Sequence, residues 1–166
     1  MYALKRISPD SLERALTKAE RYRLLNEPGE AESISRDILE LEPGNQEALI
    51  SLILALTDQF AQRASAFEQV QAAVNRLESE YDRAYYRGLA WERRAKARYL
   101  AGGPGSHHYV YEWIVKALEH FEAAEHLRPH GNDDAVLRWN ACVRLLSRDK
   151  ELKPRPEEVP DAIVSE

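Results

Sequence analysis

The feature that most constrains the fold of this chain is a helix boundary that occurs twice. In "SRDILELEPGNQEALISL" (35–52) and "FEAAEHLRPHGNDDAVLRWN" (121–140), an apolar stretch with helical periodicity ends at proline and glycine. An asparagine and an acidic residue then begin the next stretch. These are the usual signals of two helices joined by a short turn. Their repetition indicates stacked helical hairpins, because one hairpin cannot bury its apolar face alone.

The composition fits one folded domain that needs no disulfide. The chain has 166 residues, of which 44% are hydrophobic and 31% charged, and its net charge is -5. An acidic total gives no indication of nucleic-acid binding, and the single cysteine, Cys142, excludes an intrachain disulfide. The longest apolar run (48–56) is too short to span a membrane, and residues 1–16 lack the apolar core of a signal peptide. We therefore expect a cytoplasmic protein with no membrane segment.

Proline and glycine divide the chain into seven expected helices. No segment alternates with period two, so we predict no strand. The clearest loop is "AGGPGSHH" (101–108), which lacks the Gly-Lys-Ser/Thr ending of a phosphate-binding loop. From 148 to 166 the prolines exclude helix and little apolar surface is available, so we expect a flexible acidic tail. The helices are expected at about 9–25, 29–41, 45–57, 64–79, 80–100, 109–127 and 133–146.

Small residues and prolines recur with one spacing in the two boundary regions. Ala31 and Pro43 are 12 residues apart, as are Ala117 and Pro129. This pattern resembles the tetratricopeptide repeat (TPR) family, whose unit is a helical hairpin of about 34 residues with small residues where its two helices touch. The resemblance covers about 12–147. It implies an all-α, right-handed α-solenoid of about three TPR-like hairpins with a C-terminal capping helix.

The resemblance also implies where the repeat units lie, and that the third is enlarged. Gly88 and Trp91 occupy the family's close-contact and aromatic positions if that unit begins at residue 81. Counting back from Pro129 starts it at residue 98 instead, which implies an insertion of 17 residues around the 101–108 loop. The expected division is a helical domain at 1–147, with units at 12–45, 46–80 and 81–131 and a capping helix at 133–147, followed by the tail at 148–166.

The family holds peptides or partner proteins on its concave surface. Its carboxylate clamp needs Lys, Asn and Arg at set positions of the groove, and a chaperone C-terminal carboxylate binds there. The matching positions of the first two units hold Leu16, Glu20, Ile50 and Leu54. We therefore expect a groove that is more apolar than a clamp, and a ligand other than a terminal carboxylate.

The stretch "YDRAYYRGLAWERRAKARY" (81–99) is both basic and aromatic. It can be a solvated face over a packing stripe, a site for an acidic peptide, or a site where single-stranded nucleic acid stacks. The acidic total charge makes nucleic acid the least favoured of the three. By analogy with the family, the expected partner contacts are Tyr85, Tyr86, Leu89, Arg93 and Asn140.

We expect no catalytic residue, cofactor or metal. His108 and Glu112 are one helical turn apart, but no third ligand shares their face. Cys142 lies among apolar residues, which favours a buried small hydrophobe over a nucleophile.

The expected function is a protein- or peptide-binding scaffold or adaptor that uses the concave groove, with no enzymatic activity. A ligand with apolar anchors is expected, and an acidic one is an option. Two alternatives stay open: a secretion-type or assembly chaperone for a protein client, and a nucleic-acid-associated module that uses 81–99. The segment 156–166 combines acids with Ala162, Ile163 and Val164. It is a candidate for self-association, in a groove of its own chain or a neighbour's.

Overall fold

The computed structural model describes residues 1–156, and residues 157–166, which carry the tail hypothesis, lie outside the described part. Within residues 1–156 the chain is all-α and forms no strand, as predicted. A single 3-10 turn, η1, precedes the α-helices. The elements are η1 (Pro9–Ser11), α1 (Leu12–Leu24), α2 (Pro28–Leu41), α3 (Gln46–Thr57), α4 (Ala66–Val74), α5 (Glu80–Ala101), α6 (Ser106–Leu127) and α7 (Asp134–Arg148).

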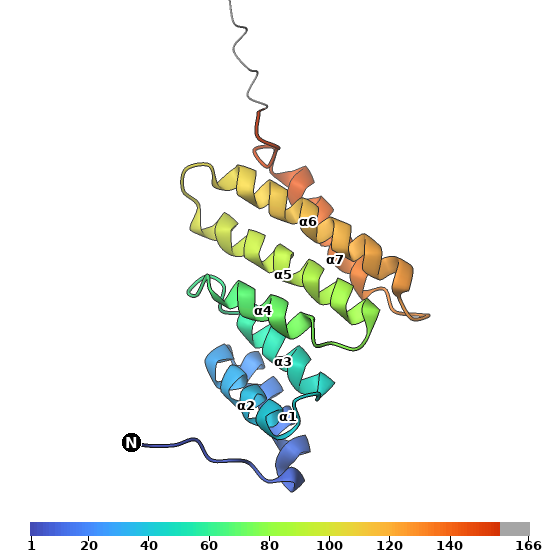
Figure 1. The fold of residues 1–166 in the computed structure, drawn as a ribbon. Helices are drawn as coiled ribbons and strands as arrows, with labels where there is room; N and C mark the ends of the chain where they lie inside the picture. Colours follow the sequence, from blue (N-terminus) through green and yellow to red (C-terminus); the bar gives the residue numbers. More distant parts are fainter. Residues whose placement is uncertain (157–166) are drawn as a thin grey trace, which may run out of the picture.

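Each helix packs on the next one along the chain, and the odd-numbered helices also meet one another. Contacts join α1 to α3, α3 to α5 and α5 to α7. The even-numbered helices α2, α4 and α6 make no comparable contacts among themselves. Figure 1 shows the resulting elongated body, with α1 and α2 at one end and α6 and α7 at the other. The odd-numbered helices therefore form one continuous layer.

The predicted helix boundaries around the two prolines are confirmed. Pro43 and Pro129 each lie two residues beyond the last residue of their helix. Asn45 caps α3, because its side-chain oxygen accepts a hydrogen bond of 2.9 Å from the backbone N–H of Ala48. Such a cap satisfies one of the N–H groups that a helix start leaves without a partner.

The predicted helix 64–79 is wrong at its C-terminal end, because α4 ends at Val74. The residues that follow turn so that Leu77 is buried. The Arg83 guanidinium then donates to the carbonyls of Leu77 and Glu78, at 2.6 and 2.9 Å. The burial of Leu77 and the hydrogen bonds to the two carbonyls outweigh the helix propensity of the residues after Val74, which is only a weak preference.

The loop predicted at 101–108 is also shorter than expected, since α6 begins at Ser106. The connection is made by Gly102, Gly103 and Gly105, which adopt φ angles of 65°, 98° and 68°. Only glycine adopts these angles at no steric cost, so three glycines complete a tight reversal in a few residues. Ser106 is buried.

The longer connection between α3 and α4 is held by a nearly buried carboxylate, Glu32 of α2. It accepts hydrogen bonds from Arg36 at 2.7 Å, from Gln59 at 2.8 Å and from Arg63 at 3.0 Å. Gln59 and Arg63 belong to the connection itself. Burial alone would raise the pKa of Glu32, but the hydrogen bonds from Arg63, Gln59 and Arg36 outweigh it and lower the pKa to about 2.

The core has two main clusters that share α5. The N-terminal cluster is built mostly on α2, α3 and α4, and the C-terminal cluster on α5, α6 and α7. Tyr86 and Trp91 of α5 pack against both. Gly88 lies where α5 and α6 approach closely, because a Cβ there would stand 2.7 Å from the Phe121 ring. The small-residue position that the sequence predicted at Gly88 is therefore a real close contact.

The residues after α7 lie against the body as far as the structure describes them. The hydroxyl of Tyr99 donates to Asp149 at 2.8 Å, and Leu152 is buried in the C-terminal cluster. Arg155 pairs with Glu112 at 3.3 Å and lies over the Tyr109 ring. In residues 1–156, no helix combines the length and the apolar character needed to cross a membrane.

Candidate functional site

An open cleft of about 420 Å³ lies between α1 and α3, on the layer of odd-numbered helices. Apolar side chains form one part of its lining and carboxylates another. Each of the two helices contributes both polar and aliphatic side chains to the lining. The lining residues are Glu13, Leu16, Thr17, Glu20 and Arg23 from α1, with Glu47, Ile50, Ser51 and Leu54 from α3.

The two helices supply matching positions to the cleft. Glu13 and Glu47, Leu16 and Ile50, and Thr17 and Ser51 are each 34 residues apart, as are Glu20 and Leu54. Within each helix the four positions are spaced 3, 1 and 3 residues apart, which places them on one face of an α-helix. The same face of two successive hairpins therefore forms the cleft.

The cleft carries net negative charge at its edge. Among the described residues, none of Glu13, Glu20 and Glu47 has an ion-pair partner. The one cation in the lining, Arg23, donates through Nε to Asp58 at 2.8 Å. The lining therefore holds three carboxylates against one guanidinium, beside an apolar floor of Leu16, Ile50 and Leu54.

The groove positions that the sequence predicted in the first two units all line this cleft. Leu16, Glu20, Ile50 and Leu54 belong to its lining. Three of these four side chains are aliphatic, and the fourth, Glu20, is a carboxylate.

The five predicted partner contacts lie elsewhere, on α5 and α7. Leu89 must be corrected: only 2% of it is exposed, because it packs in the C-terminal cluster and offers no surface to a partner. Tyr85 and Tyr86 are half-buried and pack edge to face, with ring centroids 5.1 Å apart. Asn140 is half-buried on α7.

The fifth predicted contact, Arg93, joins α5 to the end of α3. Its guanidinium donates to the Thr57 hydroxyl at 2.7 Å and forms an ion pair with Asp58. Burial lowers the pKa of Arg93, although the Asp58 carboxylate opposes the shift. Arg93 and Arg23 therefore share the Asp58 carboxylate at the margin of the cleft. The sequence analysis did not predict this contact for either arginine.

Most of the basic, aromatic stretch 81–99 is used inside the molecule. Arg87 donates to the Asn75 side chain at 2.8 Å. The Arg94 guanidinium lies between two rings, 4.1 Å from the centroid of Phe67 and 4.3 Å from that of Trp113. These contacts hold α5 to its neighbours, so Arg87 and Arg94 are not simply the solvated face that the sequence offered as one interpretation.

A buried carboxylate at the α5–α7 contact escaped the sequence analysis. Glu92 is fully buried, is paired with Lys96, and lies 3.5 Å from Arg138 of α7, while its second oxygen has no hydrogen-bond partner among the described residues. The sequence shows that Glu92 and Lys96 are four residues apart, but it could not show the contact with Arg138, which lies 46 residues from Glu92.

The pKa of the Cys142 thiol is raised to about 12, mainly by burial and also by the nearby charge of Glu92. A raised pKa disfavours the reactive thiolate.

The two side chains considered as a metal pair have other partners. A ring nitrogen of His108 lies 3.1 Å from the carbonyl of Lys153, and Glu112 pairs with Arg155. In the described part of the chain, no group of three or more His, Cys, Asp or Glu side chains is placed to hold a metal ion.

Comparisons with known proteins were made for the whole chain. It matches no protein-family model, and neither the curated proteins nor the solved structures give a match. The function of the cleft must therefore be inferred from the residues that line it.

Proposed function

We propose that this chain is a protein- or peptide-binding scaffold that holds its ligand in the cleft between α1 and α3. The observation that carries the proposal is an apolar floor beside carboxylates that have no ion-pair partner within residues 1–156. The same positions of two successive hairpins build it. Apolar anchors give most of the affinity in such sites, and charged rims set orientation and specificity. A binding module of this kind needs no catalytic group and no cofactor.

The proposal includes a TPR-like, right-handed solenoid of three hairpins, with α7 as its cap. Three observations support it: the contacts between successive odd-numbered helices, the 34-residue spacing of the cleft positions, and the buried alanines at the predicted small positions. If the odd-numbered helices pack more closely than the even-numbered ones, they line the inner side of a curved array. The cleft then belongs to the concave surface.

The charge of the cleft favours a ligand that is basic and apolar. The rim of Glu13, Glu20 and Glu47 would repel an acidic segment and attract lysine or arginine. Two other hollows would suit an acidic ligand better: Lys96, Arg144 and Arg148 line one between α5 and α7, and Arg94 and Arg98 line one with Phe67 and Trp113. A chaperone for a protein client, the main alternative, would use the same cleft.

The test is affinity capture from the native cell extract with a blocked cleft. Thr17→Arg places a long side chain into the cleft at an exposed position, so the fold should be unaffected. Ser33→Arg makes the same kind of change at an exposed position of α2, outside the cleft. We expect the unmodified chain and Ser33→Arg to retain the same specific protein, and Thr17→Arg to retain about tenfold less of it. Equal capture by all three would rule the cleft out as the binding site.

A further inference from the structure

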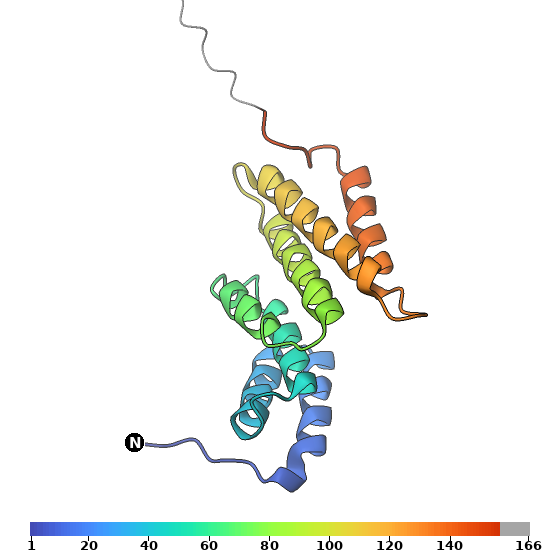
Figure 2. The same cartoon turned by 45° about the vertical axis from the view of Figure 1, so that its right-hand side comes forward.

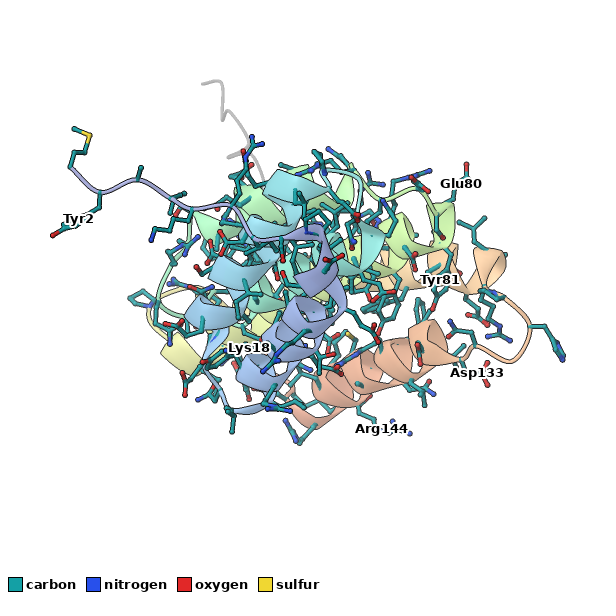
Figure 3. The ribbon with its side chains drawn as sticks, turned by 90° about the horizontal axis from the view of Figure 1, so that it is seen from below. Tyr2, Lys18, Glu80, Tyr81, Asp133 and Arg144 are labelled. Carbon is teal, nitrogen blue, oxygen red and sulfur yellow. The ribbon has the colours of Figure 1, made fainter. Side chains whose placement is uncertain are left out.

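The first seven residues form an arm whose apolar side chains have little contact with the body. Tyr2 and Leu4 are essentially fully exposed, and Ile7 is the first residue that packs against the N-terminal cluster. Figures 1 and 2 show the arm running away from the helices, and Figure 3 shows Tyr2 standing outside the helical body. Lys5 and Arg6 follow directly. The arm is thus a short segment that is both apolar and cationic, the chemistry that the cleft favours.

We infer that this arm docks into the cleft between α1 and α3 of a second copy of the chain. Two cations of the arm would meet the three carboxylates of the rim, which form no ion pair in the described part of the chain. Arg6 is free to exchange, because its ion pair with Glu40 spans 3.8 Å between side chains that are 79% and 70% exposed. An ion pair so exposed contributes little.

The spacing of the arm also matches the floor of the cleft. In an extended segment, residues two apart point to the same side, so Tyr2 and Leu4 project together about 7 Å apart. Ile50 and Leu54 are one turn apart on α3, about 6 Å along the helix. Two apolar side chains of the arm thus meet two apolar side chains of the floor, and burial of both pairs drives the association.

The arm fits a second copy better than its own cleft because it leaves the body on another side. Leu4, Lys5 and Arg6 line a hollow with Asp37 and Glu40 of α2. Figure 2 shows the arm running toward the α2 side of α1. The cleft lies between α1 and α3, and none of Leu4, Lys5 and Arg6 belongs to its lining. Two copies that each give an arm and receive one form a closed, symmetric dimer.

Sedimentation equilibrium of the purified full chain tests this inference by charge reversal. We expect a monomer–dimer equilibrium that weakens with added salt. Both Lys5→Glu with Arg6→Glu in the arm and Glu13→Lys with Glu47→Lys in the cleft should raise the dimer dissociation constant about tenfold. The chain that carries all four changes should dimerise again, because the pairs are restored with opposite signs. The control, Lys18→Glu with Arg21→Glu, changes two exposed cations of α1 outside the cleft and should dimerise like the unmodified chain.

Two results would overturn the inference: a monomer at every concentration, or a dimer that ignores reversal of the arm charges. The inference rests on the cleft being a binding site, as proposed above, but needs no foreign protein. A monomer in the centrifuge with capture abolished by Thr17→Arg would remove the arm exchange and leave the proposed function standing. A dimer that follows the charge reversals, with no foreign protein captured, would leave self-association as the role of the cleft.

Discussion

At the residue scale, the α5–α6 contact depends on the absence of a side chain at Gly88. An added Cβ would lie 2.7 Å from two ring atoms of Phe121, so the ring must move. We expect Gly88→Ala to lower the free energy of unfolding by about 1–2 kcal/mol, since the cost of overpacking exceeds the gain in helix propensity. Urea unfolding measures the change. Gly29→Ala is the control, because nothing lies within 4 Å of its added Cβ, and it should cost nothing. Equal stability of the two variants would contradict a tight contact.

Single residues also show how far the sequence could predict the site. Leu16, Glu20, Ile50 and Leu54 could be assigned to groove positions because the expected repeat gives equivalent positions in successive helices, but the predicted partner contacts were other residues. Leu89 was misplaced because the same rule ignores the residues of α6 and α7 that pack in one cluster with it. Glu92 was missed because half of its environment comes from Arg138, far away in the sequence. Local spacing predicts which side a residue faces, and distant contacts decide whether that side is exposed.

At the element scale, the α3–α4 connection is fixed by Glu32, and this makes stability depend on pH. The folded pKa of Glu32, about 2, lies below its ordinary value of 4.5, so the carboxylate stabilises the fold fully above pH 4.5. That contribution is lost as the pH falls from 4.5 toward 2. We expect Glu32→Gln to cost up to about 3 kcal/mol at pH 7 and progressively less below pH 4.5, by urea unfolding at several pH values.

The control for the Glu32 prediction is Glu30→Gln, an exposed acid of the same helix, which should change the stability little at any pH. A Glu32→Gln penalty that stays the same at pH 3 and pH 7 would mean that packing, and not the charge, explains it.

The number and order of the helices could be predicted from proline, glycine and the apolar periodicity alone. The end of α4 and the length of the 102–105 turn did not, because they depend on the burial of Leu77 and on glycine angles that no pattern specifies.

At the scale of the whole molecule, helices contact only their near neighbours, so stability should be distributed along the chain. The N-terminal and C-terminal clusters meet mainly at α5, and Leu54 of α3 also packs against the C-terminal cluster. A substitution in one cluster should therefore loosen its own helices first. This differs from a globular core, in which any cavity lowers the stability of every element together.

Hydrogen exchange on two matched variants tests this distribution of stability. Ile114→Ala and Ile53→Ala each remove a fully buried isoleucine, from α6 and α3, at a cost of about 2–5 kcal/mol. We expect Ile114→Ala to speed amide exchange mainly in α6 and α7, and Ile53→Ala mainly in α2, α3 and α4. Because α5 contributes to both clusters, it should respond to either change. Equal acceleration of all helices in both variants would show that the array unfolds as one cooperative unit. The cleft between α1 and α3 would then share the stability of the distant α6–α7 end, instead of depending on its own hairpins.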